Sequence, residues 1–181
     1  ALNLPLITED PLSFPNAITC ASIFLADEAI REYLKPDYVV VIGRTTLSRS
    51  INSFINLSPN QYVIDKRINK LDTARVATKK FENLPELVID NFDKNYGEKF
   101  VLASNNSEAS LKWSEAQISK TLCENLPSGA AFFIGSSRPI RDIEAFANSR
   151  EGISVFANRG LAGIDGNLST IFGIAEHFER T

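Results

Sequence analysis

Apolar residues along this chain follow two kinds of spacing, one typical of strands and one typical of helices. Residues 38–42 form a continuous apolar run, and residues 61–64 form a shorter run rich in β-branched and aromatic side chains. Such runs are expected of strands covered on both faces. Between them, Leu47, Ile51 and Phe54 recur at helical spacing. Strand, helix and strand in this order predict βαβ units, a parallel sheet and therefore an α/β fold.

The flanking segments predict the other elements of the first half. Residues 22–34 have a helical pattern that ends before Pro36, because the residue preceding a proline avoids the α-helical region. Residues 4–7 are expected to form a strand. The polar, asparagine-rich stretch 93–110 is expected to be an irregular linker.

A second α/β unit is expected to begin near residue 111. Ser114 followed by Gln117 forms a capping-box pattern that opens a helix. The elements expected after it are a strand at 130–134, a helix at 138–148, a strand at 153–157 and a helix from about residue 168. We therefore predict two domains, 1–110 and 111–181, the first incomplete at its N-terminal end and the second at its C-terminal end.

The glycine-rich loop 158–166 is the most informative stretch for chemistry. It holds three of the nine glycines and lies between a predicted strand and a predicted helix. Glycines there allow positive φ and a close approach of the backbone to a ligand, and this edge of an α/β sheet is where ligands bind. Arg159 offers a planar fork for a carboxylate or a phosphate. A surface loop with a solvated arginine is the alternative, and the loop alone does not choose between them.

The turn 135–141 repeats this arrangement one strand earlier. Its two serines are placed to cap the following helix, whose free amides favour an anion. Arg138 and Arg141 share a helix face near the positive end of the helix dipole, where an anion would offset their unfavourable placement. We therefore favour an anion site. A salt bridge from the arginines to Asp142 or a neighbouring carboxylate is the alternative.

A third strand-to-helix turn, 43–49, also carries arginines, among them Arg49. It is either a further anion contact or a solvated helix start. The basic stretch 66–80 is interpreted as a solvated face, because acidic residues interrupt it and no aromatic residues are interleaved for stacking.

Composition and charge exclude several classes of function. The 181 residues carry a net charge of -3, and nucleic acid is not expected as a partner because its binders usually have a basic patch. No apolar run approaches the roughly 20 residues that cross a bilayer, and no leader peptide is recognisable. Cys20 and Cys123 are interpreted as buried thiols of a reducing compartment, and the single histidine, His177, argues against a histidine-rich metal site. We expect a cytoplasmic protein without membrane insertion.

Two motifs together resemble one family of thiamine-diphosphate enzymes. GSSRPIRDIEAFA at 135–147 and VFANRGLAGIDGNLST at 155–170 are similar to a stretch of the MenD family, the 2-succinyl-5-enolpyruvyl-6-hydroxy-3-cyclohexene-1-carboxylate synthases. DYVVVIGRTTLSRSI at 37–51 resembles the central domain of that family, particularly of its actinobacterial members. The resemblance implies that residues 1–110 are a Rossmann-like central domain lacking its first strand. Residues 111–181 would then be the first part of the α/β domain that binds thiamine diphosphate.

The resemblance also implies a reaction. The family decarboxylates 2-oxoglutarate on thiamine diphosphate and adds the resulting succinyl unit to isochorismate, a step of menaquinone biosynthesis. The complete enzyme is expected to use thiamine diphosphate and Mg²⁺ and to be a homo-oligomer, either a dimer or a tetramer. The family's activating glutamate and its Gly-Asp metal motif match no residues here. No catalytic residue or metal ligand is therefore assigned, and the chain alone is expected to be inactive.

Site residues follow from the resemblance only where motif positions match. The matched positions are Ser137, Arg141, Arg159 and Arg49 for substrate, and Gly163 and Ile164 for the cofactor. The first three face substrate carboxylates in the family, and Arg49 stands where the family often has a lysine near the substrate. Ile164 matches the apolar residue that holds the cofactor bent, which brings its two reacting rings together.

Alternatives from other classes stay open. The same arginine turns suit a stand-alone α/β module that binds an acidic metabolite. A different thiamine-diphosphate enzyme, similar to acetolactate synthase, would have a substrate pocket without a preference for carboxylates. A Gly-Asp-containing strand soon after residue 181 would favour the synthase, whereas a natural end of the chain there would favour the binding module.

Overall fold

The chain divides into two compact units. The computed structural model describes residues 4–67, 76–86, 88, 92–109, 111–158 and 165–178. One unit is formed by residues 22–100, and the other by residues 4–21 together with 101–181. Both contain parallel strands and helices, so the predicted α/β fold class is confirmed. The assignment of residues 1–110 and 111–181 to named domains stays a prediction.

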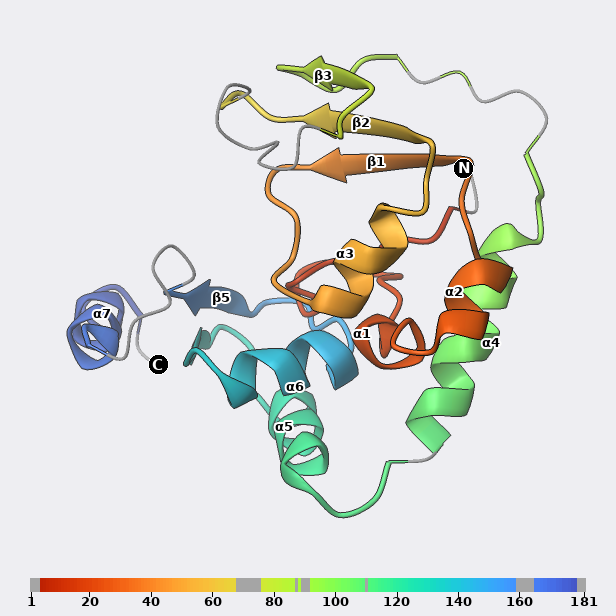
Figure 1. Cartoon of the computed structure of the whole chain (residues 1–181). Coiled ribbons are helices and arrows are strands. Elements are labelled where there is room, and N and C mark those ends of the chain that lie inside the picture. The colour runs from red at the N-terminus through yellow and green to blue at the C-terminus, as the bar shows by residue number, and fades with distance from the viewer. Residues whose placement is uncertain are drawn as a thin grey trace. The chain divides into compact units, whose positions relative to one another are not determined.

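The described part of the first unit contains a parallel sheet with the order β1-β2-β3. Its strands are β1 (Tyr38–Ile42), β2 (Asn60–Ile64) and β3 (Lys79–Phe81). Helix α3 (Arg49–Ile55) connects β1 to β2 and covers one face of the sheet (Figure 1). The predicted strand–helix–strand unit is therefore confirmed. β3 was not expected, and its first two residues are the last two of the basic stretch 66–80 that was interpreted as a solvated face.

The single helix expected over residues 22–34 is two shorter helices, α1 (Ala21–Phe24) and α2 (Glu28–Tyr33). Asp27 causes the break, because its carboxylate accepts hydrogen bonds from the amides of Ala29 and Ile30 at 2.8 and 3.3 Å. It thereby caps α2 and begins a new helix.

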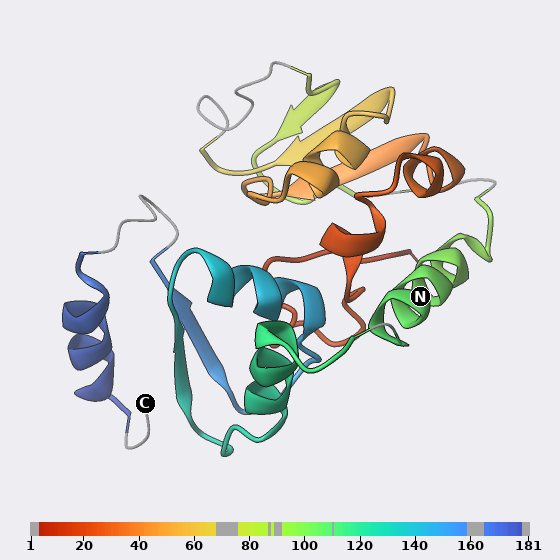
Figure 2. The same cartoon turned by 60° about the horizontal axis from the view of Figure 1, so that its bottom comes forward.

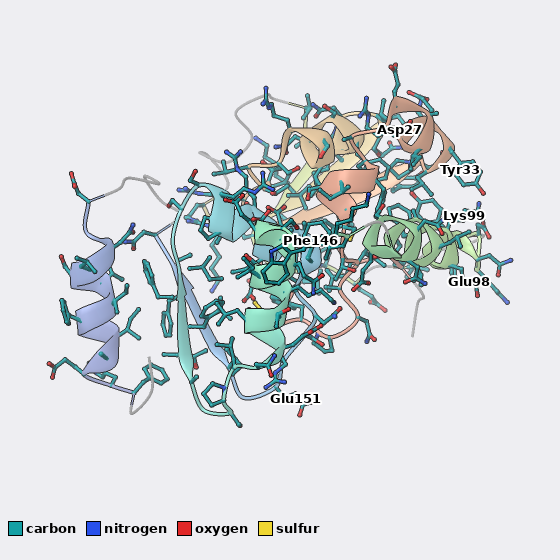
Figure 3. The ribbon with its side chains drawn as sticks, turned by 90° about the horizontal axis from the view of Figure 1, so that it is seen from below. Asp27, Tyr33, Glu98, Lys99, Phe146 and Glu151 are labelled. Carbon is teal, nitrogen blue, oxygen red and sulfur yellow. The ribbon has the colours of Figure 1, made fainter. Side chains whose placement is uncertain are left out.

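The prediction of an irregular linker at 93–110 is wrong, because this stretch forms α4 (Tyr96–Ala109). Phe100 is 1% exposed, and its ring lies 5.1 to 6.1 Å from three other aromatic rings, those of Phe24, Phe54 and Tyr96. The Nζ atom of Lys99, the residue before Phe100, lies 5.7 Å from the centre of the Tyr33 ring (Figure 3). Tertiary burial of one face therefore stabilises a helix that the polar composition does not suggest.

The second unit contains α5 (Glu115–Glu124), β4 (Ala131–Ile134), α6 (Arg138–Phe146), β5 (Ser154–Ala157) and α7 (Asn167–Ala175). β4 and β5 are parallel neighbours, as Figure 2 shows. Ser114 caps α5 as expected, since its hydroxyl accepts a hydrogen bond from the amide of Gln117. The predicted elements of this half are thus confirmed, with ends that shift by one or two residues.

The N-terminal segment belongs to this second unit. The strand expected at 4–7 is reduced to a single parallel bridge between Leu6 and Ala17. Leu12 is 1% exposed and packs in a core cluster with Ile134, Ile140 and other apolar residues. The segment is therefore held mainly by apolar burial and only locally by strand pairing.

No helix among the described residues is long and apolar enough to span a membrane.

Cys20 and Cys123 are buried free thiols. Burial raises the pKa of each to about 11, with the charges of Glu108 and Glu124 respectively adding to the effect. An unfolded thiol loses its proton nearer pH 8.5. Between these values the folded state holds protons that the unfolded state has lost, so stability falls as pH rises.

We expect the free energy of unfolding of the chain to fall between about pH 8 and about pH 10.5, by on the order of 2 kcal/mol per buried thiol. Urea unfolding at the two pH values measures the change. The double variant Cys20→Ala/Cys123→Ala should show a clearly smaller loss. An equal loss in the variant would mean that other groups cause the pH dependence.

Candidate functional site

The carboxyl ends of β4 and β5 bring together Ser136 of the first motif and Asn158 of the second. Ile134 ends β4 and pairs in register with Ala157, which ends β5. Beyond these ends, the Ser136 hydroxyl donates a hydrogen bond to the backbone carbonyl of Asn158 at 3.3 Å. Ser136 and Asn158 are 22 residues apart in sequence, yet they meet at the edge of the sheet where α/β proteins bind ligands.

Ser137 occupies the N-cap position of α6 in an unusual backbone conformation. Its φ of 77° and ψ of -122° lie where residues other than glycine are rarely found. Its hydroxyl accepts no hydrogen bond from a described amide of α6, so it does not cap the helix as the sequence suggested. Pro139 lies in the first turn, and the remaining first-turn amides have no side-chain cap. The residue is exposed, so its hydroxyl is accessible to an anion at the start of the helix.

We expect Ser137→Gly to stabilise the chain by about 1 kcal/mol, because glycine relieves the strain of the positive φ, although it also gives the unfolded chain more freedom. Ser137→Ala is the matched variant, since it removes the same hydroxyl but keeps the strain. Urea unfolding of both measures the difference. Equal stability of the two variants would contradict a strained conformation at this position.

The two arginines of α6 have different surroundings. Arg138 forms an ion pair with Asp142 at 2.9 Å and lies 3.6 Å from a carboxylate oxygen of Glu115. The hydrogen bond to Asp142 raises the pKa of Arg138. The salt-bridge alternative left open by the sequence therefore holds for Arg138. Arg141 is exposed and forms no ion pair with any residue that the structure describes.

Asn158 connects this edge to α7. Its side-chain amide donates hydrogen bonds to the Thr170 hydroxyl at 3.1 Å and to the Asn167 side-chain oxygen at 3.3 Å. The Thr170 hydroxyl also bonds to the carbonyl of Gly166 at 2.8 Å. Sequence reasoning noted the motif that contains Asn158 but gave this side chain no role.

Arg159, Gly163 and Ile164, which the sequence assigned to substrate and cofactor, lie outside the described residues. Their roles stay predictions. Of the assigned residues in this unit, the structure therefore places Ser137 and Arg141, which lie together in the first turns of α6.

The first unit has a charged edge of its own. Gly43 follows β1 with a φ of 77°, and its amide donates to the carbonyl of Ile64 at 2.9 Å. Asp65, directly after β2, accepts two hydrogen bonds from the guanidinium of Arg67, at 3.0 and 3.2 Å. These bonds hold the pKa of Asp65 below its usual value. Sequence reasoning missed this pair, although a carboxylate at the end of a buried strand was a visible signal.

Arg49, the fourth residue assigned to substrate, is the first residue of α3 in this unit and is exposed. Ser48 caps the helix, its hydroxyl accepting from the Ile51 amide. The structure therefore places Arg49 at an accessible helix start, which fits both interpretations that the sequence left open.

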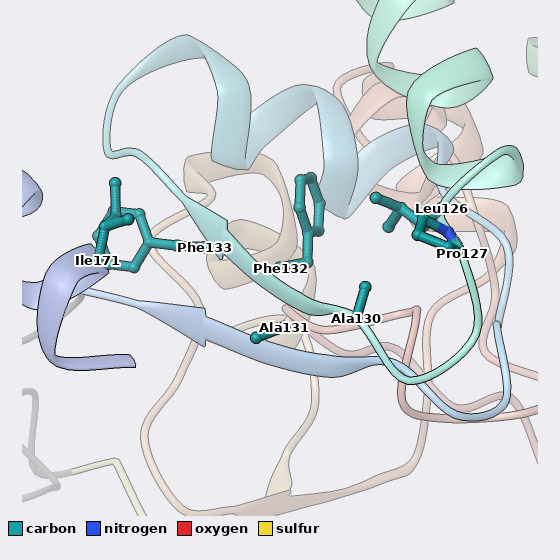
Figure 4. Close-up of a pocket in the computed structure, with 7 residues that line it drawn as sticks. All are labelled: Leu126, Pro127, Ala130, Ala131, Phe132, Phe133 and Ile171. Atoms are coloured by element: carbon teal, nitrogen blue, oxygen red, sulfur yellow. The ribbon is translucent and has the colours of Figure 1, made fainter. Parts of the chain in front are cut away.

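An open cavity of about 400 Å³ lies beside β4 in the second unit (Figure 4). Its lining residues are Leu126, Pro127, Ala130, Ala131, Phe132, Phe133 and Ile171. All of these side chains are apolar, so no side chain among the described lining residues would bind a carboxylate. The polar candidate site is therefore the edge beyond β4 and β5, where Ser136 and Asn158 meet.

Comparisons with known proteins support the resemblance seen in the motifs. No family model matches the chain. It is 29% identical to 2-succinyl-5-enolpyruvyl-6-hydroxy-3-cyclohexene-1-carboxylate synthase of Thermobifida fusca, over 94% of this chain and 33% of the relative. Synthases of the same name from Microcystis aeruginosa and Trichodesmium erythraeum are 30% and 27% identical, over 89% and 99% of this chain. The chain spans about a third of the length of these relatives.

Proposed function

We propose, from this similarity to the synthases, that the chain is part of a thiamine-diphosphate-dependent carboligase. The enzyme would join decarboxylated 2-oxoglutarate to isochorismate in menaquinone biosynthesis. The observation that carries the proposal is the meeting of two family motifs at one sheet edge, where Ser136 bonds to Asn158. Ser137 directly follows Ser136, and Arg141 follows within the same helix start, which supports their assignment to one site.

Ser137 and Arg141 are proposed to hold a carboxylate of the substrate. The uncapped first-turn amides of α6 and the Ser137 hydroxyl supply hydrogen-bond donors, and Arg141 supplies a positive charge with a planar fork. Both proposed substrates carry carboxylates, so such an edge suits either of them. Arg159 and Arg49 are proposed as further contacts with substrate.

Thiamine diphosphate with Mg²⁺ would supply the stabilisation of the carbanion in the complete enzyme. Gly163 and Ile164 are proposed to contact the cofactor. The described residues contain no group of three or more acidic, histidine or cysteine side chains that could hold a metal. We therefore assign no metal ligand among them.

Synthase activity of the isolated chain is not expected under this proposal. The complete enzyme is proposed to be a cytoplasmic homo-oligomer.

The proposal is tested on the parent polypeptide, extended at both ends to the length of its relatives. It is incubated with isochorismate, 2-oxoglutarate, Mg²⁺ and thiamine diphosphate, and the absorbance of isochorismate is followed. We expect consumption that requires the cofactor and falls at least tenfold in Arg159→Ala, because an arginine on a carboxylate makes charge-assisted hydrogen bonds.

Lys112→Ala is the matched control, because it removes one exposed positive charge outside the proposed site. It should consume isochorismate at the rate of the wild type. A well-folded parent that consumes no isochorismate would refute the synthase, and the binding module or another thiamine-diphosphate enzyme would replace it. Turnover by the 181-residue chain alone would refute its proposed inactivity.

A further inference from the structure

Asn158 lies between the turn after β4 and the helix α7, and its polar groups bond in both directions. Its side-chain amide donates to Thr170 at 3.1 Å and to Asn167 at 3.3 Å, both in α7. Its backbone carbonyl accepts the hydrogen bond from the Ser136 hydroxyl at 3.3 Å. These three contacts form a continuous chain from α7 to the residue that precedes Ser137.

The chain of contacts bears on the orientation of the Ser136 turn. The bonds from the Asn158 amide hold its side chain against α7, and the backbone carbonyl of the same residue accepts the hydrogen bond from Ser136. Thr170 is itself held, because its hydroxyl contacts the carbonyl of Gly166 at 2.8 Å. Asn158, Ser136 and Thr170 are all partly buried, and hydrogen bonds shielded from water in this way are more effective than exposed ones.

The turn is also where the backbone needs external support. Ser137, next to Ser136, has a φ of 77°, a conformation that persists in a residue with a side chain only when neighbouring contacts hold it. Among the described residues, no side chain caps α6 at this point. The hydrogen bond between Ser136 and Asn158 is a described tertiary contact that can supply this support.

We propose that Asn158 is a positioning residue for the carboxylate-binding turn: through Ser136 it holds Ser137 and the first amides of α6 in the orientation that receives a substrate carboxylate. The proposal rests on the proposed function for the identity of the ligand. Asn158 itself is not assigned a contact with substrate. Its effect is on the pre-formation of the site, which lowers the cost of binding.

The test uses four variants of Asn158 and Thr170 in the parent polypeptide, together with one control variant. Asn158→Ala removes the side-chain bonds to α7, and Asn158→Asp keeps the shape but replaces the amide donor by an acceptor. Thr170→Val removes the hydroxyl that receives the Asn158 bond, and Thr170→Ser restores it. Asn106→Ala, in α4, is the matched control, because Asn106 is exposed. Urea unfolding of each variant shows separately how far overall stability changes.

Two quantities are measured for each variant. The first is the pair of kinetic constants KM and kcat. They are measured for whichever of the two substrates shows a raised KM in Ser137→Ala, a variant that lacks the proposed carboxylate-binding hydroxyl. The second is the rate of amide hydrogen exchange over residues 134–140, which requires no activity. We expect Asn158→Ala to raise that KM about tenfold with kcat within threefold, and to speed exchange over the turn. Thr170→Val and Asn158→Asp should show smaller increases in KM and in the exchange rate. Thr170→Ser should resemble the wild type in both.

The inference is overturned if Asn158→Ala leaves both KM and exchange over 134–140 as in Asn106→Ala. It is also overturned if the variant lowers kcat and overall stability together without a separate change in KM, which is the outcome of a merely structural role. A parent polypeptide without synthase activity would refute the proposed function instead. In that case exchange alone decides: faster exchange over the turn supports the coupling through Asn158, and unchanged exchange refutes it.

Discussion

Phe100→Ala is expected to destabilise the chain by about 4 kcal/mol, because it empties a fully enclosed aromatic site. The ring is 1% exposed and packs edge-on against Phe24, Phe54 and Tyr96, at centroid distances of 6.1, 5.8 and 5.1 Å. Removing it loses both the apolar burial and three aromatic contacts. Phe24, Phe54 and Tyr96 come from three helices, α1, α3 and α4, so the cavity cannot close by a local shift alone. Urea unfolding of the chain measures the loss.

Leu102→Ala is the control for this change. Leu102 lies on the same helix, α4, but is 62% exposed. Its truncation should change the free energy of unfolding by no more than about 0.5 kcal/mol. A loss below about 1 kcal/mol for Phe100→Ala would show that the aromatic cluster does not hold α4 in place.

Arg141→Ala is expected to lower kcat/KM of the parent polypeptide on the order of 100-fold, under the proposed function. Charge-assisted hydrogen bonds from a guanidinium to a carboxylate contribute about 1.5 to 3 kcal/mol each, and one or two of them account for this factor. Arg141 is exposed in the first turns of α6 and forms no ion pair with described residues, so its guanidinium is available for substrate. Steady-state kinetics with isochorismate and 2-oxoglutarate measure the effect.

Arg141→Lys separates charge from geometry at this position. Lysine keeps the positive charge but lacks the planar fork, so its kcat/KM should fall between those of the wild type and Arg141→Ala. Lys112→Ala removes an exposed charge elsewhere in the second unit and should leave kcat/KM within twofold of the wild type. An Arg141→Ala variant within threefold of the wild type would remove Arg141 from the proposed site.

Local patterns in the sequence correctly predicted most of the elements. The apolar run before Gly43, the capping pattern at Ser114 and the alternation of strands and helices each specify an element from residues that are close together in the chain. Hydrophobic period and cap chemistry are local properties, so no tertiary information was needed to recognise them. The motif resemblance was available for the same reason, since each motif is a short continuous stretch.

The tertiary structure decided the features that depend on distant residues. A polar stretch became α4 because Phe100 reaches an aromatic cluster formed by other helices. The structure decided for the salt bridge at Arg138, because this arginine pairs with Asp142 one helical turn away. The anion site at Arg141 stays a prediction. Asn158 meets Ser136 across 22 residues only because β4 and β5 pair in parallel.

Sequence alone therefore determined most of the strands and helices, their order and the motifs that they carry, because these depend on the local spacing of residue types. Which side chains find partners, which remain accessible and which backbone positions are strained depend on contacts between segments far apart in the chain. Such contacts form only when burial of apolar surface brings the segments together, and local patterns do not record which partner each side chain meets.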